Sequence, residues 1–211
     1  MNTKGIIFDL DGVIVFTDKF HYLAWKAVSD ELGIYFDEKI NNRLRGVSRM
    51  DSLEIILEGG KREYSENEKI EIAEKKNEIY KGYLSKMTPS DVSDEVRKTL
   101  IELKKRGYLL AIGSSSKNTK YILERVALSD FFDAVSDGTN IKKSKPDPEV
   151  FLNAAEFIKL SPFECAVVED AFAGIDAAKS GGMTAVAIGD AASYEKADIV
   201  LGTFSDLLKH F

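Results

Sequence analysis

The stretch Ile6-Ile7-Phe8-Asp9-Leu10-Asp11-Gly12-Val13 decides how the rest of the chain is arranged. The apolar run from Lys4 to Phe8 predicts a strand of a parallel sheet, because such strands are covered on both faces and lose the alternation of apolar and polar residues. Asp9 and Asp11 then fall in the turn at the carboxyl end of the strand, where ligands bind in open α/β sheets. A solvated turn and a cation site both account for two carboxylates so close together.

The composition is that of an ordinary globular protein, and it limits the partners. The 211 residues permit one large domain or a main domain with a smaller one. Charged residues make up 30% and hydrophobic residues 44%, and the formal net charge is -6. This acidic balance disfavours nucleic-acid and anionic-membrane partners, which require a basic surface. A local cluster of Lys and Arg would still allow an anionic small-molecule substrate.

The single cysteine and the lack of long apolar stretches predict a cytoplasmic protein. We also expect the protein to be a monomer. Cys165 lies in the apolar run 165–168, which favours a buried structural thiol over a nucleophile. Because the sequence has no second cysteine, it cannot form an intrachain disulfide, which fits a protein of a reducing compartment. His21 and His210 lie too far apart in sequence to indicate a zinc site. No stretch suggests a membrane span or a signal peptide.

From about Val15 to Met87 the sequence shows helix patterns and no convincing strand. Thr17 and Asp18 are expected to cap a first helix that ends at Gly33. Further helices are expected to begin at Ser48 and Ser65. We therefore expect residues 15–87 to form an all-helical cap domain.

The remainder of the chain alternates helices and strands. Helices are expected at 94–106, 117–127 and 174–179, at the C-terminus, and from Pro148 with Asp147 as its cap; strands are expected at 108–112, 132–135, 165–168, 184–188 and 198–201. This rhythm predicts an α/β fold with a doubly wound, Rossmann-like parallel sheet. The core domain is then discontinuous, covering 1–14 and 88–211, and the cap inserted after the first strand covers the Asp9/Asp11 turn.

Polar residues follow several of the predicted strands at their carboxyl ends. Gly113-Ser114-Ser115-Ser116-Lys117-Asn118 offers hydroxyls, Lys145 precedes a proline, and Glu169-Asp170 ends a strand. Each has a simple structural explanation: a capped loop, an exposed loop lysine, or an acidic helix cap. Together they indicate phosphoryl transfer, in which one carboxylate attacks phosphorus, a second carries a proton, and lysine, hydroxyls and Mg²⁺ hold the phosphate oxygens.

These motifs resemble those of the haloacid dehalogenase superfamily of phosphotransferases. The residues that carry the resemblance are Phe8-Asp9-Leu10-Asp11-Gly12-Val13, Ser114, Lys145-Pro146 and Glu169-Asp170. The resemblance implies that Asp9 is the nucleophile and becomes phosphorylated, and that Asp11 is the general acid/base. It also implies Mg²⁺ held by Asp9, Asp11 (through its backbone carbonyl), Glu169 and Asp170, and phosphate bound by Ser114 and Lys145.

Segments of the expected cap narrow the resemblance. His21–Lys26, Leu44–Leu53, Lys76-Asn77 and the loop Ser114–Asn118 are similar to the phosphosugar mutases of that superfamily, which interconvert β-D-glucose 1-phosphate and glucose 6-phosphate through glucose 1,6-bisphosphate. The implied roles are Arg49 for the phosphate not being transferred, Gly46, Val47 and Ser48 for the sugar, Ser116, Lys117 and Asn118 for the reacting phosphate, and His21 and Lys76 for cap closure.

Three other cap residues are open to more than one interpretation. Arg45 clusters with Arg43 and Arg49 and could grip phosphate, whereas a solvent-exposed helix end is favoured for Arg43. Trp25 is a candidate for the sugar site, but packing inside the cap is favoured, since aromatic residues at helical spacing usually face inward.

The sequence departs from the usual pattern of the family at two positions, and two other functions are also considered. Phe16 stands where many relatives carry an acidic residue, and Ala171 stands where a serine is common. One rival is a sugar-phosphate phosphatase on the same scaffold, with water as the acceptor. The other is a non-catalytic phosphate-binding protein, which is disfavoured because every acidic residue and the lysine of the core motifs are present.

Overall fold

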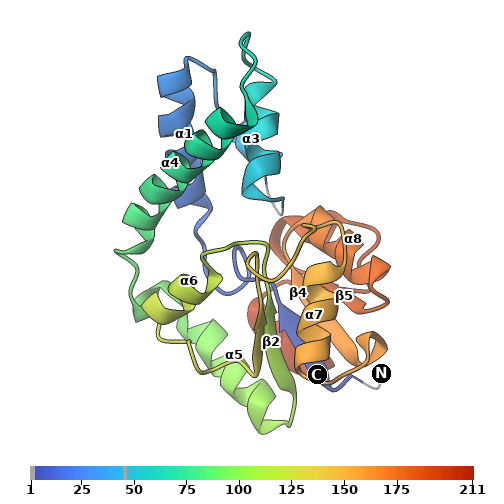
Figure 1. Ribbon diagram of the computed structural model, residues 1–211. Helices are drawn as coiled ribbons and strands as arrows, with labels where there is room; N and C mark the ends of the chain where they lie inside the picture. Colours follow the sequence, from blue (N-terminus) through green and yellow to red (C-terminus); the bar gives the residue numbers. More distant parts are fainter. Residues whose placement is uncertain (1–2, 45–46) are drawn as a thin grey trace.

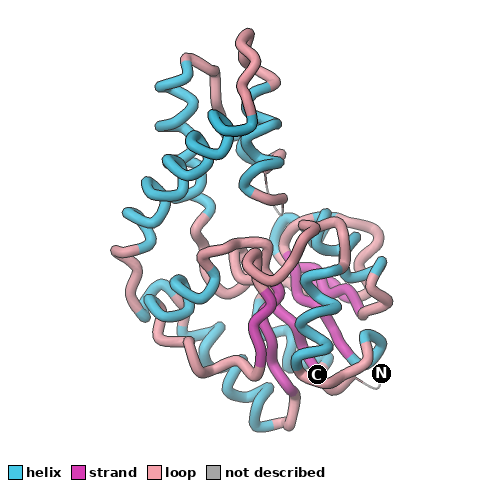
Figure 2. The backbone as a smooth tube through the Cα atoms, in the orientation of Figure 1, coloured by secondary structure: helices cyan, strands magenta, loops and turns pink. Residues whose placement is uncertain are grey.

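The computed structural model describes residues 3–44 and 47–211, and within these ranges it contains one six-stranded parallel sheet (Figures 1 and 2). The strands are β1 Gly5–Phe8, β2 Leu109–Gly113, β3 Ala134–Ser136, β4 Cys165–Glu169, β5 Thr184–Ala187 and β6 Ile199–Val200. Their order is β3-β2-β1-β4-β5-β6, and every neighbouring pair is parallel. The predicted doubly wound α/β fold is therefore confirmed, with β1 in the middle of the sheet.

Helices cover both faces of this sheet. The face that carries Ile6 and Phe8 packs against α5 Asp94–Lys105, α6 Thr119–Arg125 and α9 Leu207–His210. The face that carries Ile7 packs against α7 Glu149–Phe157 and α8 Phe172–Ser180. Because successive strand side chains point to opposite faces, this single strand contributes to both apolar layers. Ile6, Ile7 and Phe8 are accordingly fully buried.

The remaining helices form a separate bundle at the carboxyl end of the sheet, and we call them the cap helices (Figure 1). They are α1 Asp18–Leu32, α2 Glu38–Asn42, α3 Arg49–Leu57 and α4 Glu66–Leu84. They enclose a small apolar core of their own around Trp25, Leu53 and Ile56. None of the helices in the described ranges has the length and apolarity needed to span a membrane.

Local signals place the ends of these helices. Gly33 ends α1 in the left-handed conformation with φ 67°, which glycine adopts without strain. The Ser48 hydroxyl accepts a hydrogen bond from the backbone N–H of Asp51 at the start of α3. Ser65 and Glu68 form a capping box at the start of α4. The predicted ends at Gly33, Ser48 and Ser65 are confirmed.

Several expectations about element ends are wrong in detail, among them the helix expected at 117–127, which is α6 Thr119–Arg125. The Thr17 hydroxyl does not cap α1, because it bonds Asp11 and Tyr80 instead. Strand β3 begins at Ala134 rather than 132, since the Asp133 carboxylate accepts a hydrogen bond from the backbone N–H of Leu110. Pro148 precedes α7 rather than opening it.

The chain passes twice between the sheet and the cap helices, first at residues 9–17 and again at residues 85–93, and hydrogen bonds join the second crossing to the core. The Arg125 guanidinium donates to the backbone carbonyl of Met87 at 2.9 Å. The Arg97 guanidinium donates to the carbonyls of Pro89 at 2.6 Å and Val126 at 2.8 Å. These bonds fix residues 87–89 to the core helices α5 and α6.

Candidate active site

The register of the sheet brings three strand ends to one level. Phe8 pairs with Ile112 of β2 on one side and with Val168 of β4 on the other. The next residues along, Asp9 and Glu169, therefore leave the carboxyl edge side by side, and Ser114 follows β2 at the same edge. This edge lies where the strand order reverses around β1, which is the position at which doubly wound sheets bind ligands.

Lys145 joins the two carboxylates at this edge. Its ammonium group donates to Asp9 Oδ1 at 2.5 Å and to Glu169 Oε1 at 2.7 Å, and its side chain is almost fully buried. Burial alone would lower the pKa of Lys145, but the carboxylates of Asp9 and Glu169 raise it above its usual value. The lysine is therefore a permanent positive charge beside Asp9. The simple alternative of an exposed loop lysine is therefore excluded.

Asp9, Glu169 and Asp170 form an acidic cluster that fits a divalent cation. Each offers a carboxylate oxygen, and these oxygens lie within 4.8 Å of one another. Burial raises the pKa of Glu169, although Lys145 opposes the shift, so further positive charge would favour its ionised form. An all-oxygen donor set of this kind suits Mg²⁺ or Ca²⁺.

Two glycines leave room for these carboxylates. A Cβ on Gly12, whose φ is +86°, would lie 2.1 Å from Asp170 Oδ2. A Cβ on Gly174 would lie 2.0 Å from the Glu169 carboxyl group. The chain thus needs glycine at both positions for the acidic cluster to form.

Asp11 lies outside this cluster and is hydrogen-bonded to Thr17 in the first crossing of the chain. Its Oδ1 accepts a hydrogen bond from the Thr17 hydroxyl, whose oxygen also lies 2.9 Å from the hydroxyl of Tyr80 on α4. Burial raises the pKa of Asp11 to about 7, while the bond from Thr17 opposes the shift. A carboxyl group with this pKa both donates and accepts protons near neutral pH.

The cap helices place Lys76, His21 and Arg49 across the cavity from the sheet edge. Lys76 Nζ lies 2.8 Å from His21 Nδ1 and 4.9 Å from the ring centroid of Trp25. Burial, with a further contribution from Arg49, lowers the pKa of Lys76 to about 7. Burial and Lys76 lower the pKa of His21 well below its usual value, so His21 is neutral. An anionic ligand would favour the charged form of Lys76.

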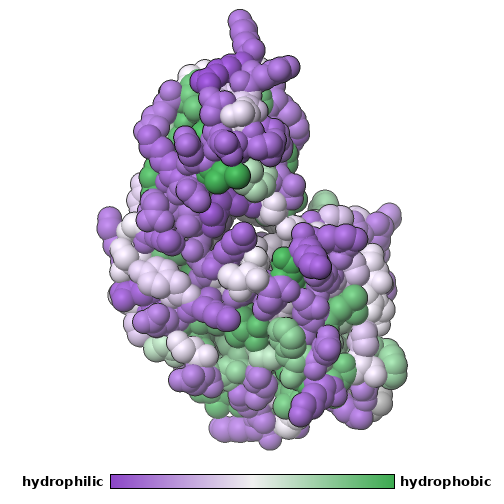
Figure 3. All heavy atoms as spheres, in the orientation of Figure 1, coloured by the Kyte–Doolittle hydropathy of each residue, from purple (hydrophilic) through white to green (hydrophobic). Residues whose placement is uncertain are grey.

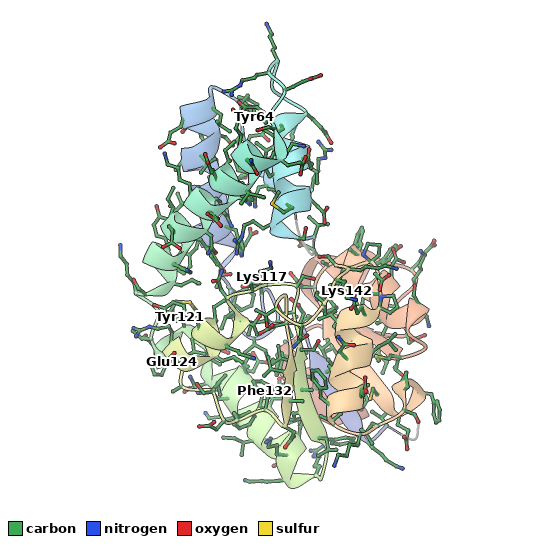
Figure 4. The ribbon with its side chains drawn as sticks, viewed as in Figure 1. Tyr64, Lys117, Tyr121, Glu124, Phe132 and Lys142 are labelled. Carbon is green, nitrogen blue, oxygen red and sulfur yellow. The ribbon has the colours of Figure 1, made fainter. Side chains whose placement is uncertain are left out.

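A cavity of about 800 Å³ lies between the sheet edge and the cap helices, and Figure 3 shows it as a hollow between the two parts. Lys117 stands at its edge on the core side (Figure 4). Every predicted site residue in the described ranges lines it: Asp9, Asp11, His21, Trp25, Val47, Ser48, Arg49, Lys76, Ser114, Ser116, Lys117, Asn118, Lys145, Glu169 and Asp170. Arg45 and Gly46, also predicted, lie outside the described residues.

Two ambiguous cap residues are resolved by their contacts. Trp25 is only 2% exposed and packs in the apolar core of the cap helices, as favoured, although it also borders the cavity. Arg43 is exposed and pairs with Glu58 at 2.7 Å, which confirms its assignment to a solvated helix end.

The structure adds cavity residues that the sequence did not single out as site residues. Asn77 accepts a hydrogen bond at 2.9 Å from the side-chain amide of Asn118, which links α4 to the core loop. Tyr80 lies one turn further along α4. Tyr80, four residues after Lys76, lies on the same helix face, and that spacing is the signal that could have identified it. Phe16 is 72% exposed beside the cavity.

Comparison with known proteins identifies the class. The model of the haloacid dehalogenase-like hydrolase family matches residues 3–182, and the chain belongs to this family.

Individual proteins of this family are similar to the chain over most of its length. The chain is 44% identical over 206 residues to a β-phosphoglucomutase of Bacillus subtilis, covering 97% of this chain and 91% of the relative. A crystal structure of β-phosphoglucomutase from Clostridium difficile superposes with a TM-score of 0.92 at 39% identity, covering 97% of this chain and 93% of that one. A phosphorylated carbohydrates phosphatase of Thermotoga maritima is 31% identical over 183 residues, covering 85% of this chain and 82% of the relative.

Proposed function

We propose that this protein is a phosphosugar mutase that interconverts β-D-glucose 1-phosphate and glucose 6-phosphate through a β-glucose 1,6-bisphosphate intermediate. The 44% identity to a β-phosphoglucomutase over nearly the whole chain supports this activity. The observation that carries the proposal is the cavity, which has the Asp9–Lys145 pair on one wall and Lys76 and Arg49 on the other. A substrate with phosphate at both ends needs positive charge on both walls.

Asp9 and Asp11 divide the chemistry between them. In one half-reaction a carboxylate oxygen of Asp9 attacks the phosphorus, the bond between phosphorus and the sugar oxygen breaks, and Asp11 gives that oxygen a proton. The products are aspartyl phosphate and a sugar hydroxyl. In the other half-reaction a sugar hydroxyl loses its proton to Asp11 and attacks the phosphorus on Asp9, and the bond between phosphorus and the Asp9 oxygen breaks, which frees the carboxylate. The bisphosphate turns round in the cavity between the two.

The other cavity residues hold the substrate. Lys145 and Ser114, together with Ser116, Lys117 and Asn118, bind the oxygens of the phosphoryl group in transfer. Arg49 binds the phosphate at the other end, and Val47 and Ser48 border the sugar. Each contact is strengthened when water is excluded. Asp9, Glu169 and Asp170, with the backbone carbonyl of Asp11, would hold Mg²⁺, which neutralises charge on the phosphoryl oxygens.

Residues 15–87 act as a cap domain on a core formed by 1–14 and 88–211. A phosphorylated aspartate reacts with any nearby nucleophile, so a mutase must keep water out while the sugar hydroxyl is in place. The cap helices close the cavity when the substrate bridges Arg49 and the core loop. His21 and Lys76 lie at the base of the cap, where closure brings them toward Asp11.

A paired product assay tests the proposal. The protein receives β-glucose 1-phosphate, Mg²⁺ and a trace of glucose bisphosphate, and glucose 6-phosphate and free phosphate are followed in the same sample. Rapid formation of glucose 6-phosphate with little free phosphate is expected. Free phosphate as the main product would make the protein a phosphatase instead.

The nucleophile is tested by Asp9→Asn. We expect turnover to fall by at least about a thousandfold with the fold intact, since an amide does not form the phosphoryl intermediate. Asp130→Asn, at an exposed position in the loop after α6, is the matched control and should keep full turnover. Full activity in Asp9→Asn would rule out Asp9 as the nucleophile.

A further inference from the structure

Tyr80 connects the cap helices to Asp11 through its hydroxyl group. It lies on α4 and is 1% exposed. Its ring centroid lies 4.1 Å from that of His21, and the Lys76 ammonium stands 4.6 Å from it. Its hydroxyl lies 2.9 Å from Thr17 Oγ1, and within the described ranges this is the hydrogen bond that satisfies it. A buried phenol hydroxyl without a partner would be unfavourable, so this contact matters to the fold as well.

The direction of the hydrogen bonds follows from the number of protons. Thr17 has one hydroxyl proton, and it donates that proton to Asp11 Oδ1. The contact between Thr17 and Tyr80 therefore has Tyr80 as the donor. The result is a chain of two bonds, from Tyr80 to Thr17 and from Thr17 to Asp11. It runs from a cap helix, through the first crossing, to the turn after β1.

We propose that Tyr80 is a positioning residue for the proposed mutase reaction, because its hydroxyl holds the Thr17 hydroxyl in the orientation that orients Asp11. This inference rests on the proposed role of Asp11 as the general acid/base. Without the Tyr80 hydroxyl, Thr17 loses the donor that fixes its rotation. Asp11 then spends less time in the orientation needed for proton transfer. Tyr80 itself exchanges no proton with the substrate.

The test is Tyr80→Phe, which removes the hydroxyl and keeps the ring packed against His21 and Lys76. We expect kcat to fall about tenfold, a fraction of what an acid/base group contributes, with KM changed by less than about twofold. Tyr83→Phe is the matched control, since Tyr83 lies on the same helix with its ring stacked on Phe20. It should leave both constants unchanged. Wild-type kcat in Tyr80→Phe, or a change in KM alone, would overturn the proposal.

A double-mutant cycle separates positioning from a general structural effect. In a Thr17→Val background, Tyr80→Phe should lower kcat no further, because the path to Asp11 is already broken. Thr17→Ser should recover most of the kcat lost in Thr17→Val, since it keeps the hydroxyl. Additive losses in kcat would show that Tyr80 acts independently of Thr17 and would contradict the proposal.

The outcome for Tyr80 can be separated from the outcome for the mutase itself. The paired product assay on the unaltered protein comes first. If free phosphate is the main product, the proposed acceptor is wrong, but Asp11 would still be needed to activate water. The same variants are then compared by the rate of phosphate release. The loss of kcat in Tyr80→Phe is expected there too, and its absence overturns the role of Tyr80 alone.

Discussion

Lys76 is an ammonium group enclosed by aromatic rings and a neutral histidine. Its side chain is 2% exposed, and it contacts His21, Trp25 and Tyr80. Within the described part of the chain, no carboxylate forms an ion pair with it. Such a site is unfavourable for the folded protein alone and favourable once an anion enters the cavity. We interpret it as stability given up in favour of substrate binding.

The pH dependence of stability should reveal this cost. The pKa of Lys76 is about 7 in the folded protein and 10.5 as its ordinary value. Below pH 7 the residue is charged in both states, so the full penalty of burying the charge is present. Between pH 7 and 10.5 the unfolded chain binds more protons than the folded one, so this contribution to stability rises with pH. Lys76→Met should therefore be more stable than wild type at pH 6, by on the order of a few kcal/mol.

Urea unfolding at pH 6 and pH 9.5 measures the effect. The advantage of Lys76→Met should shrink at the higher pH. Lys75→Met is the matched control, because Lys75 lies on the same helix but is exposed and pairs with Glu31 at 2.6 Å. Its stability should change little, and equally at both pH values. A pH-independent difference for Lys76→Met would contradict a buried, titrating lysine.

For single residues, the sequence predicts chemical roles better than it predicts which side chains are in contact. Asp9, Lys145 and Glu169 could be found because the set as a whole indicates phosphoryl transfer, although each residue alone has a simple structural explanation. The contact between Lys76 and His21 joins residues far apart in the chain, and no local pattern encodes that distance. Tyr80 lies in a helical apolar stripe, where a tyrosine with a functional hydroxyl looks like any core aromatic.

Among the elements, α4 carries the most cap residues that face the cavity. It presents six residues to the cavity: Ile70, Ala73, Glu74, Lys76, Asn77 and Tyr80. Lys76 and the two residues after it in this set lie about three turns or more beyond the N-terminal cap, Ser65. The capping box of Ser65 and Glu68 satisfies backbone N–H groups at the far end of this helix. The N-terminal end of α4 thus stabilises the helix, and its middle part, from Ile70 to Tyr80, contributes side chains to the cavity.

Ser65→Ala should separate stability from activity. We expect the free energy of unfolding to fall by about 1 kcal/mol, since the backbone N–H of Glu68 loses its acceptor. kcat should stay at the wild-type value, because fraying in the first turn does not reach Lys76. Ser85→Ala, beyond the other end of α4, removes only a hydrogen bond to the Gly82 carbonyl and should be nearly neutral. Chemical denaturation and steady-state kinetics on both variants decide the matter.

Element ends could be predicted where a local signal fixes them, and not elsewhere. Ser48, Ser65 and Gly33 act on backbone groups within three or four residues, so the sequence nearby contains the information. The start of β3 depends on Asp133, whose carboxylate binds the backbone of the neighbouring strand. Thr17 has the residue type of a cap, but Asp11 and Tyr80 compete for its hydroxyl. The start of β3 and the role of the Thr17 hydroxyl therefore depend on tertiary contacts, which a local sequence pattern does not contain.

For the whole molecule, the proposed reaction depends on the two walls of the cavity meeting around the substrate. Arg49 lies on the cap wall, and burial lowers its pKa. Arg49→Ala should lower kcat/KM about ten- to hundredfold, as expected for loss of hydrogen bonds between charged groups. It should also raise the share of free phosphate, because the substrate no longer holds the cap closed.

The product ratio in the paired assay checks this prediction. Arg43→Ala is the control, since Arg43 belongs to the same cap helices but pairs with Glu58 on the outside. It should leave both kcat/KM and the product ratio unchanged. An Arg49→Ala variant that loses activity without any change in the product ratio would show that Arg49 binds substrate but does not contribute to closure.

The central place of β1 also bears on how the protein is made. Gly5 pairs with Leu109 and with Cys165, so β1, which is made before the other strands of this sheet, finds both neighbours only after Cys165 has been made. The apolar core of the cap helices contains no residue beyond Ala73 and can assemble much earlier. We expect the nascent chain to carry a folded helical bundle while β1 is still unpaired. The exposed apolar residues of β1 can then bind chaperones until β4 emerges.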